Sequence, residues 1–180
     1  MRVYTLRFNL FLLLSALAPV LAGCEAFHHK HEPLSALAVY VSVAPNTATG
    51  PFSGAKTVSV LRADPVKVTI DTQPILTEQD VVAAKVINTP DAPAIDIQFS
   101  PMGTVVLEQY SATNPGGHFV ILGKWGKDLQ YTRWLMAPLI TTRITDGVLS
   151  FTPDMSRDEA NQFVLGLNNV AKQKQSDQNE

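Results

Sequence analysis

Residues 94–112 read AIDIQFSPMGTVVLEQYSA, and the spacing of the apolar residues changes within this stretch. In residues 94–99 apolar and polar side chains alternate, which predicts a half-buried β-strand. Ser100 and Pro101 then provide a helix N-cap and a proline at the first helical position. The stretch therefore predicts a strand that passes directly into a helix, and Asn114-Pro115-Gly116 predicts where that helix ends.

Two more helices have start signals on either side of this unit. Thr77 and Asp80 have the spacing of a capping box, which predicts a helix from there to about Val86. Residues 156–159 read SRDE, a complete capping box at the start of another helix. An apolar stripe at helical spacing follows it, formed by Ala160, Phe163, Val164 and Leu167.

Short segments rich in β-branched and aromatic residues predict the remaining strands. They lie at residues 38–43, 57–61, 66–70, 119–122, 134–140 and 148–151. Asp146-Gly147 precedes the last of them and is a turn signal. Strands interspersed with helices favour an α+β fold. We expect a single domain over residues 37–171, with a mixed, mostly antiparallel sheet and about three helices on one face.

The N-terminal segment has the features of a lipoprotein signal. Arg2 and Arg7 are basic, and residues 8–22 are mostly apolar. This apolar run is shorter than the roughly 20 residues of a membrane-spanning helix and fits a signal peptide. Residues 21–24 read LAGC and resemble the lipobox of bacterial lipoproteins, in which a peptidase cleaves before the cysteine.

The lipobox resemblance implies that the Cys24 thiol carries fatty-acyl chains such as palmitate. We expect a signal peptide over residues 1–23, a lipidated cysteine and flexible tether over 24–36, and a disordered tail over 172–180. Each buried lipid CH₂ contributes about 0.8 kcal/mol, so the lipid would hold the protein on the cell membrane or outer membrane, facing the periplasm or the exterior. The alternative is a plain secretory signal with a chance cysteine.

Several segments also follow one another in the order found in a known family. They are residues 74–81, 94–99, 111–116, 118–122, 137–140, 144–151 and 155–160. From Gln73 to Leu167 this order resembles the periplasmic head region of SecD, the accessory subunit of the Sec protein translocase. The resemblance implies a SecD-head-like α+β fold and a contact surface outside the cytoplasm.

The chain departs from SecD in two respects. SecD has several transmembrane helices whose acidic residues support proton-coupled work, and no later segment of this sequence is long and apolar enough to span. Residues 123–128 read GKWGKD where the family has a tight strand turn, and we expect turns there. The resemblance therefore implies a fold and not a motor.

Charge and cysteine content exclude some function classes. The formal net charge is −2 at pH 7, with 14 basic and 16 acidic residues and no basic block. Nucleic-acid binding usually needs a basic face, so we expect no nucleic-acid partner. The single cysteine leaves no disulfide, and the fold must rely on core burial.

Histidines are the first candidates for a site. His28, His29 and His31 could ligate zinc, copper or nickel, but a flexible tether lacks the outer partners that orient such ligands, so a polar spacer is favoured. His118 lacks a recognisable catalytic partner, and we expect a surface or strand-edge residue. We therefore predict no metal and no cofactor.

Acidic residues are the second candidates. Asp154, Asp158 and Glu159 could do acid–base work or bind calcium. Their place beside the first turn of the last helix favours interaction with the helix dipole instead.

Aromatic residues are the third candidates. Trp125, Tyr131 and Trp134 could form a contact patch if they were exposed together, although at least one of them is expected in the core.

The sequence thus favours a membrane-anchored lipoprotein that is not an enzyme. Its domain would bind envelope or translocating proteins, with a link to protein export. The alternatives are a self-associating envelope scaffold, whose oligomeric state the sequence leaves open, and a hydrolase with an unrecognised site.

Overall fold

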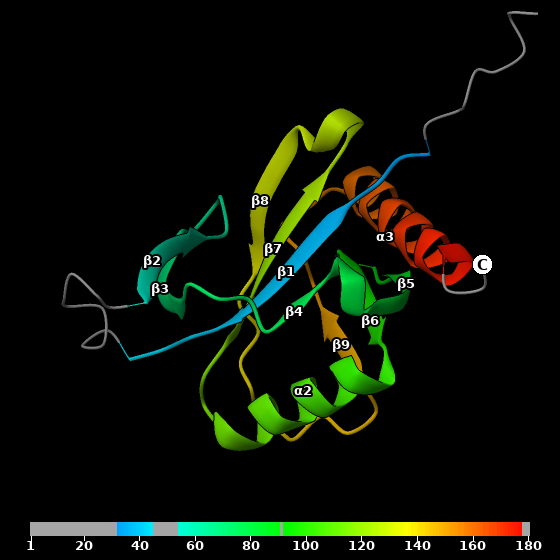
Figure 1. Cartoon of the computed structure of the whole chain (residues 1–180). Helices are drawn as coiled ribbons and strands as arrows, with labels where there is room; N and C mark the ends of the chain where they lie inside the picture. Colours follow the sequence, from blue (N-terminus) through cyan, green and yellow to red (C-terminus); the bar gives the residue numbers. More distant parts are fainter. Residues whose placement is uncertain (1–31, 45–53, 91, 178–180) are drawn as a thin grey trace, which may run out of the picture. The chain divides into compact units, whose positions relative to one another are not determined.

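The computed structural model describes residues 32–44, 54–90 and 92–177, all within one compact unit that begins at Glu32. Figure 1 shows the arrangement of its elements. In chain order they are β1 (Ala36–Val41), β2 (Ala55–Val60), β3 (Val66–Asp71), β4 (Leu76–Thr77), the 3-10 helix η3 (Glu78–Asp80), β5 (Val81–Asn88), β6 (Pro93–Phe99), α2 (Pro101–Thr113), β7 (Phe119–Trp125), the 3-10 helix η4 (Lys127–Leu129), β8 (Tyr131–Met136), β9 (Val148–Phe151) and α3 (Arg157–Asp177).

A four-stranded sheet in the order β4-β1-β7-β8 forms the centre of the unit. Its longest pairing joins β1 to β7, from Ala36 opposite Lys124 to Val41 opposite Phe119. Alternate residues of β1 serve two apolar clusters. Leu37, Val39 and Val41 belong to the main core, whereas Tyr40 packs against a second, smaller cluster.

The main core lies between this sheet, the three-stranded sheet β5-β6-β9 and α3. The apolar stripe predicted on α3 supplies part of it, since Ala160, Phe163 and Leu167 are fully buried. The helix also closes the outer edge of β5, where the Asn168 side-chain amide donates to the Ala84 carbonyl and its oxygen accepts from the Ala84 N–H. This amide therefore substitutes for a neighbouring strand.

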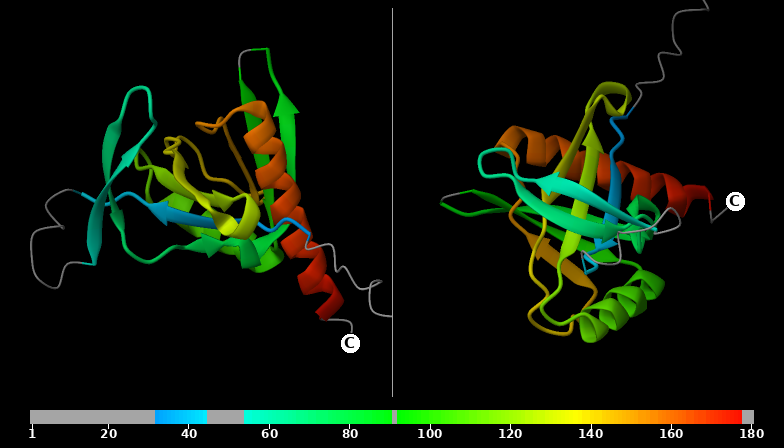
Figure 2. Two further views of the ribbon diagram at one scale, coloured as in Figure 1. Left: turned by 90° about the horizontal axis from the view of Figure 1, so that it is seen from above. Right: turned by 90° about the vertical axis from the view of Figure 1, so that its left-hand side faces the viewer.

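The hairpin of β2 and β3 lies across the other face of the central sheet, so that the hairpin and α3 are on opposite sides of it (Figure 2). The Val43 N–H donates to the Thr69 carbonyl at 2.8 Å and joins β3 to the end of β1. Under the hairpin is the second cluster, made of Val58, Val60, Ile70 and Val120 with Tyr40 and Trp134 at its border.

The helix predicted from Thr77 to Val86 is wrong. The capping box exists, because Thr77 and Asp80 bond each other's backbone, but it starts only the single turn η3. From Val81 onward the chain is β5, which pairs along its length with β6. A run rich in β-branched residues gains more from this pairing than from continuing the helix.

The predicted fold class is confirmed as α+β, but its details change. The described residues contain two α-helices rather than three, and their strands form three sheets rather than one. Every pairing is antiparallel, so no sheet is mixed. The strands β8 and β9, which precede and follow Asp146-Gly147, belong to different sheets.

Two predicted boundaries are also wrong. The tail expected from residue 172 is helical as far as Asp177, because α3 continues past its buried stripe. At the other end, Pro33 belongs to the fold rather than to a tether, since the Asn169 side chain of α3 donates to its carbonyl at 2.9 Å. Ser35 is buried beside it.

The strand expected at residues 134–140 ends early. β8 stops at Met136, and Pro138, which has no N–H to donate, lies in the extended segment that follows. The expected turn over residues 123–128 is shorter than predicted, because β7 continues to Trp125 and only Gly126 and η4 make the turn.

Candidate functional site

Several predicted sites lie outside the described residues. They are Cys24, His28, His29 and His31, and the lipid attachment and the metal alternative at those positions stay predictions. Within the part that is described, no group of three histidine, cysteine, aspartate or glutamate side chains could hold a metal ion. No helix there is long and apolar enough to cross a membrane.

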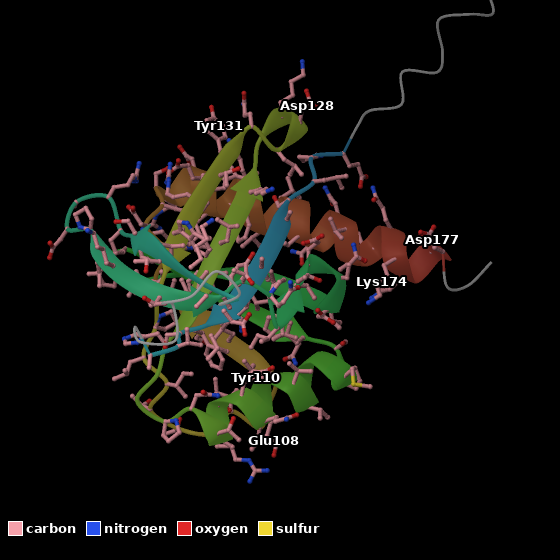
Figure 3. The ribbon with its side chains drawn as sticks, turned by 60° about the vertical axis from the view of Figure 1, so that its left-hand side comes forward. Glu108, Tyr110, Asp128, Tyr131, Lys174 and Asp177 are labelled. Carbon is pink, nitrogen blue, oxygen red and sulfur yellow. The ribbon has the colours of Figure 1, made fainter. Side chains whose placement is uncertain are left out.

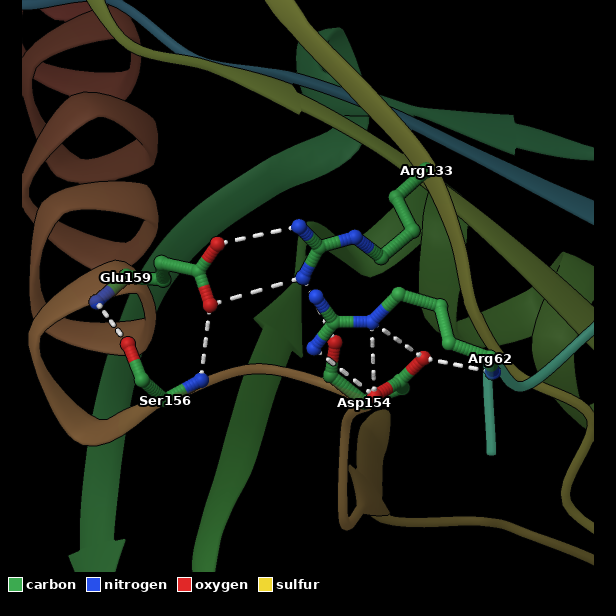
Figure 4. A network of polar contacts seen from close by, with 5 residues as sticks. All are labelled: Arg62, Arg133, Asp154, Ser156 and Glu159. Atoms are coloured by element: carbon green, nitrogen blue, oxygen red, sulfur yellow. Dashed lines mark hydrogen bonds and ion pairs between the residues drawn. The ribbon is translucent and has the colours of Figure 1, made fainter. Parts of the chain in front are cut away.

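Asp154, in the loop before α3, and Glu159, on the first turn of α3, form ion pairs with arginines from the β2–β3 turn and from β8 (Figure 4). Asp154 accepts from the Arg62 side chain at 3.0 Å and from the Arg62 backbone N–H at 2.9 Å. These hydrogen bonds hold the pKa of the Asp154 carboxyl below its ordinary value, against the opposing effect of partial burial. The pair joins the β2–β3 turn to the loop before α3.

The second ion pair orders the start of α3. Arg133 of β8 donates to Glu159 at 3.0 Å and to the Asp154 carbonyl at 2.8 Å. Glu159 also accepts from the Ser156 N–H, which completes the predicted capping box. Burial works to raise the pKa of Glu159, but the hydrogen bonds from Arg133 and Ser156 outweigh it, and the pKa is lowered.

Asp154 and Glu159 therefore bind arginine side chains of the protein itself, and they do not converge on one site that could hold a calcium ion. Asp154 and Glu159 each bind a different arginine, and Asp158 is exposed on the first turn of α3. The lowered pKa values of Asp154 and Glu159 favour their charged forms, which suits an ion pair rather than proton donation near neutral pH.

The predicted aromatic patch does not form. Trp125 is fully buried and packs against Phe163 at 6.2 Å between ring centres. Tyr131 is half exposed beside Trp125, at the tip of the β7–β8 hairpin near Asp128 (Figure 3). Trp134 is three residues further along the same strand, so it points to the opposite face, where it packs on Tyr40.

His118 is at a strand start, as predicted, and borders a groove that sequence reasoning missed. The groove has a volume of about 440 Å³. His118 is next to the beginning of β7, bridges to Leu139, and its N–H donates to the Ser42 hydroxyl at 2.8 Å. The groove therefore lies where the ends of β1, β7 and β8 meet the hairpin.

The walls of the groove are mainly apolar. They consist of Val43, Val60, Leu61, Val66, Val68, Met136 and Ala137. Polar groups come from Ser42, Thr69, Lys67 and His118. Among these lining residues the ionisable side chains, Lys67 and His118, are both basic, and none carries a carboxylate or a thiol. Such a lining can hold an apolar ligand and attract an anionic group.

The signal for the groove is present in the sequence but is not specific. The valines of β2 and β3 predict two strands. Val66 is half exposed, but its place in the alternating pattern is the same as that of a valine buried in a core, so the pattern does not distinguish the two. Only the crossing of the hairpin over the sheet places these valines opposite Met136 and Ala137.

Comparison with known proteins gives matches among solved structures alone, since no protein-family model and no curated protein matches the chain. A crystal structure of SecDF in a super-membrane-facing form has a TM-score of 0.50 and 18% identity, over 74% of this chain and 18% of that one. A structure of SecDF described as a membrane component that enhances protein export has a TM-score of 0.49 and 18% identity, over 76% of this chain and 63% of that one.

SecDF from Thermus thermophilus, described as a translocon-associated membrane protein, has a TM-score of 0.39 and 15% identity, over 91% of this chain and 34% of that one. The chain thus spans less than two thirds of the length of each of these structures. The super-membrane-facing form shows that the fold is similar to part of SecDF, which confirms the expected SecD-like fold.

Proposed function

We propose that this protein is a non-enzymatic module that binds polypeptides at the outer face of a bacterial membrane. Its ligand is an extended segment of another envelope protein or of a chain undergoing export. Lipid on Cys24 holds the module at the membrane surface, and the groove beside the hairpin is the binding surface.

The observation that carries this proposal is the composition of the groove. Apolar walls that include Val66, Met136 and Ala137 provide contact area for side chains of an extended segment. Its lining residues include no carboxylate and no thiol, and its two ionisable side chains, Lys67 and His118, are both basic. Binding is therefore the activity that this surface supports best.

The fold supports a link to export. The chain is similar in fold to part of SecDF, and SecDF is described as enhancing protein export. Fold alone does not fix function, so the proposal takes its chemistry from the groove and its setting from the lipobox and the fold.

Site-specific photo-crosslinking in living cells tests the proposal. A photoreactive residue at Ala137, which lines the groove, should form adducts with pulse-labelled exported chains, and these adducts should decrease during a chase. The same photoreactive amino acid in place of Gln109, which is exposed on α2 and does not line the groove, serves as the control. Adducts at neither position, or equal adducts at both, would contradict the proposal.

The membrane attachment has its own test. Intact-mass analysis of protein isolated from cells should give the mass of a chain cleaved before Cys24 with acyl chains added. Replacement of Cys24 by serine should release the protein from the membrane fraction. An unmodified thiol in the native protein would remove the proposed anchor.

A further inference from the structure

Strand β3 has an edge that is only partly used. Along one side all six of its residues, Val66–Asp71, pair with β2. On the other side the end of β1 reaches only Thr69 and Ile70, through the Val43 N–H bond and the bridge from Ser42. On this second side the first half of β3 therefore has no strand beside it among the described residues.

The direction of the backbone groups follows from one hydrogen bond. The Thr69 carbonyl accepts from the Val43 N–H, so the backbone groups of Thr69 point away from β2. Backbone groups in an antiparallel ladder alternate from side to side, so those of Lys67, two residues earlier, point the same way. No backbone hydrogen bond to Lys67 from another described residue exists on that side.

This open edge borders the groove. Val66, Lys67, Val68 and Thr69 all line it, together with Met136 and the other apolar residues of the opposite wall. A free N–H and C=O at the border of an apolar groove fit a polypeptide strand, because a strand offers the matching backbone groups. A lipid chain would make apolar contacts with the walls but would leave the N–H and C=O of Lys67 without hydrogen-bond partners.

We propose that the groove binds its polypeptide by strand addition, with the partner paired to β3 at Lys67. The inference rests on the proposed function and specifies its ligand. Alternate side chains of the added strand enter the apolar groove, and an acidic residue of the partner lies near Lys67 and His118. A lysine on an open strand edge also disfavours pairing with purely apolar segments, so Lys67 selects an acidic partner.

Synthetic peptides test the pairing directly. The probe is a peptide of about eight residues, alternating valine and threonine with one central glutamate, because strands of that length are common. Its affinity for the purified full chain is compared with two versions that are N-methylated at alternate residues, in opposite phases. Methylation that removes the inward-pointing N–H groups should weaken binding about tenfold, and the opposite phase should weaken it far less.

Two proline variants test the edge from the protein side. Lys67→Pro removes the N–H that points into the groove and leaves the hydrogen bonds to β2, because that residue does not use its backbone groups there. Ser59→Pro is the matched control: Ser59 is directly opposite Lys67, so its N–H points outward from the far edge of the hairpin. We expect about tenfold weaker peptide binding in the first variant and little change in the second.

The charge preference is separable from the pairing. Lys67→Ala retains the backbone N–H, so it should keep most of the affinity and lose the preference for a peptide with glutamate over one with glutamine. If Lys67→Pro does not fold, the N-methylated peptides still decide the question.

Some outcomes would overturn the inference. Equal binding of all methylated peptides, or unchanged affinity of Lys67→Pro, would exclude strand addition. Loss of self-association in Lys67→Pro, measured by sedimentation, would replace the foreign peptide with a second copy of this chain. Photo-crosslinks at Ala137 that persist while the peptide tests fail would leave the proposed function in place with a different binding mode.

Discussion

Gly166 lies on the face of α3 that contacts the N-terminal segment. A Cβ at this position would lie 2.2 Å from the Ser35 hydroxyl and 2.7 Å from the Leu34 carbonyl carbon. Alanine favours a helix over glycine by about 1 kcal/mol, but the backbone of the neighbouring segment would have to move to admit it. Close approach of two backbones therefore explains a glycine in the middle of a helix.

We expect Gly166→Ala to lower the free energy of unfolding by about 1–3 kcal/mol, because overpacking outweighs helix propensity here. Urea denaturation checks this, with Gln162→Ala, exposed on the same helix, as the control that should change stability by less than about 0.5 kcal/mol. A more stable Gly166→Ala variant would mean that the segment at Ser35 is not held against α3.

The ion pairs of Asp154 and Glu159 at the start of α3 predict an acid dependence of stability. The pKa values of Asp154 and Glu159 are lowered in the folded protein, so these groups stabilise it above their unfolded pKa values, which are about 4. The stability that they add is lost as the pH falls through their folded values. In the double variant Asp154→Asn, Glu159→Gln we expect the free energy of unfolding to change less with pH below about pH 4 than it does in the native protein.

Denaturant titrations between neutral and acidic pH measure this difference. Asp158→Asn is the control, because Asp158 is exposed and has no arginine partner among the described residues. Parallel curves for the native protein and the double variant would show that the two ion pairs add no stability that depends on pH.

At the scale of elements, the outer edge of β5 depends on one side chain of α3. Asn168 bonds both the N–H and the carbonyl of Ala84, at 2.8 and 2.9 Å. We expect Asn168→Ala to lower the free energy of unfolding by about 1–3 kcal/mol, since it leaves two partly buried backbone groups without partners. Asn161→Ala, exposed on the same helix, is the matched control.

Thermal and urea unfolding of both variants provide the measurement, and hydrogen exchange adds detail. The Ala84 amide should exchange faster in Asn168→Ala and at the native rate in Asn161→Ala. Unchanged exchange at Ala84 would indicate that water or a neighbouring group replaces the asparagine without cost.

The same edge explains why local signals failed in this part of the chain. The capping box predicted at Thr77 is present, yet it starts only one turn, because the β-branched residues after it form a strand. In contrast, the signals at Ser100 and at Ser156 each start a full helix, as predicted. A start signal alone does not fix the length of a helix, because the residues that follow it decide whether the chain continues as helix or strand.

At the scale of the whole unit, the hairpin is held to the rest of the protein by few polar contacts. Arg62 in its turn pairs with Asp154 at 3.0 Å, and the Arg62 side chain is 60% exposed. Exposed ion pairs contribute little to stability, because water screens the charges and holding the side chains in place costs entropy. The pair therefore affects the local opening of the hairpin more than it affects global unfolding.

We expect Arg62→Ala to leave the unfolding midpoint nearly unchanged and to speed amide exchange in β2 and β3, because local opening becomes easier. Hydrogen-exchange mass spectrometry measures amide exchange in the hairpin and in the rest of the protein in one experiment. Arg143→Ala, which removes an exposed ion pair with Glu108 on α2, should not affect the hairpin. If the amides of the hairpin exchange at the native rate in Arg62→Ala, the apolar cluster beneath the hairpin is enough to keep it closed without this ion pair.

The sequence by itself determined the fold class, two of the helices and most of the strands. Capping boxes and apolar periodicity are local properties, so the stripe on α3 could be recognised without knowing its neighbours. It also indicated a SecD-like fold, which the similarity in fold to part of SecDF confirms.

Only the tertiary structure decided which strands share a sheet and which side chains meet. The groove needs Val66 and Met136 in the walls of one cavity, although the strands that contribute them do not pair with each other. The same holds for the arginines that bind Asp154 and Glu159. These contacts depend on how the hairpin crosses the sheet, and local patterns carry no information on that crossing, because burial on either face produces the same alternation of residues.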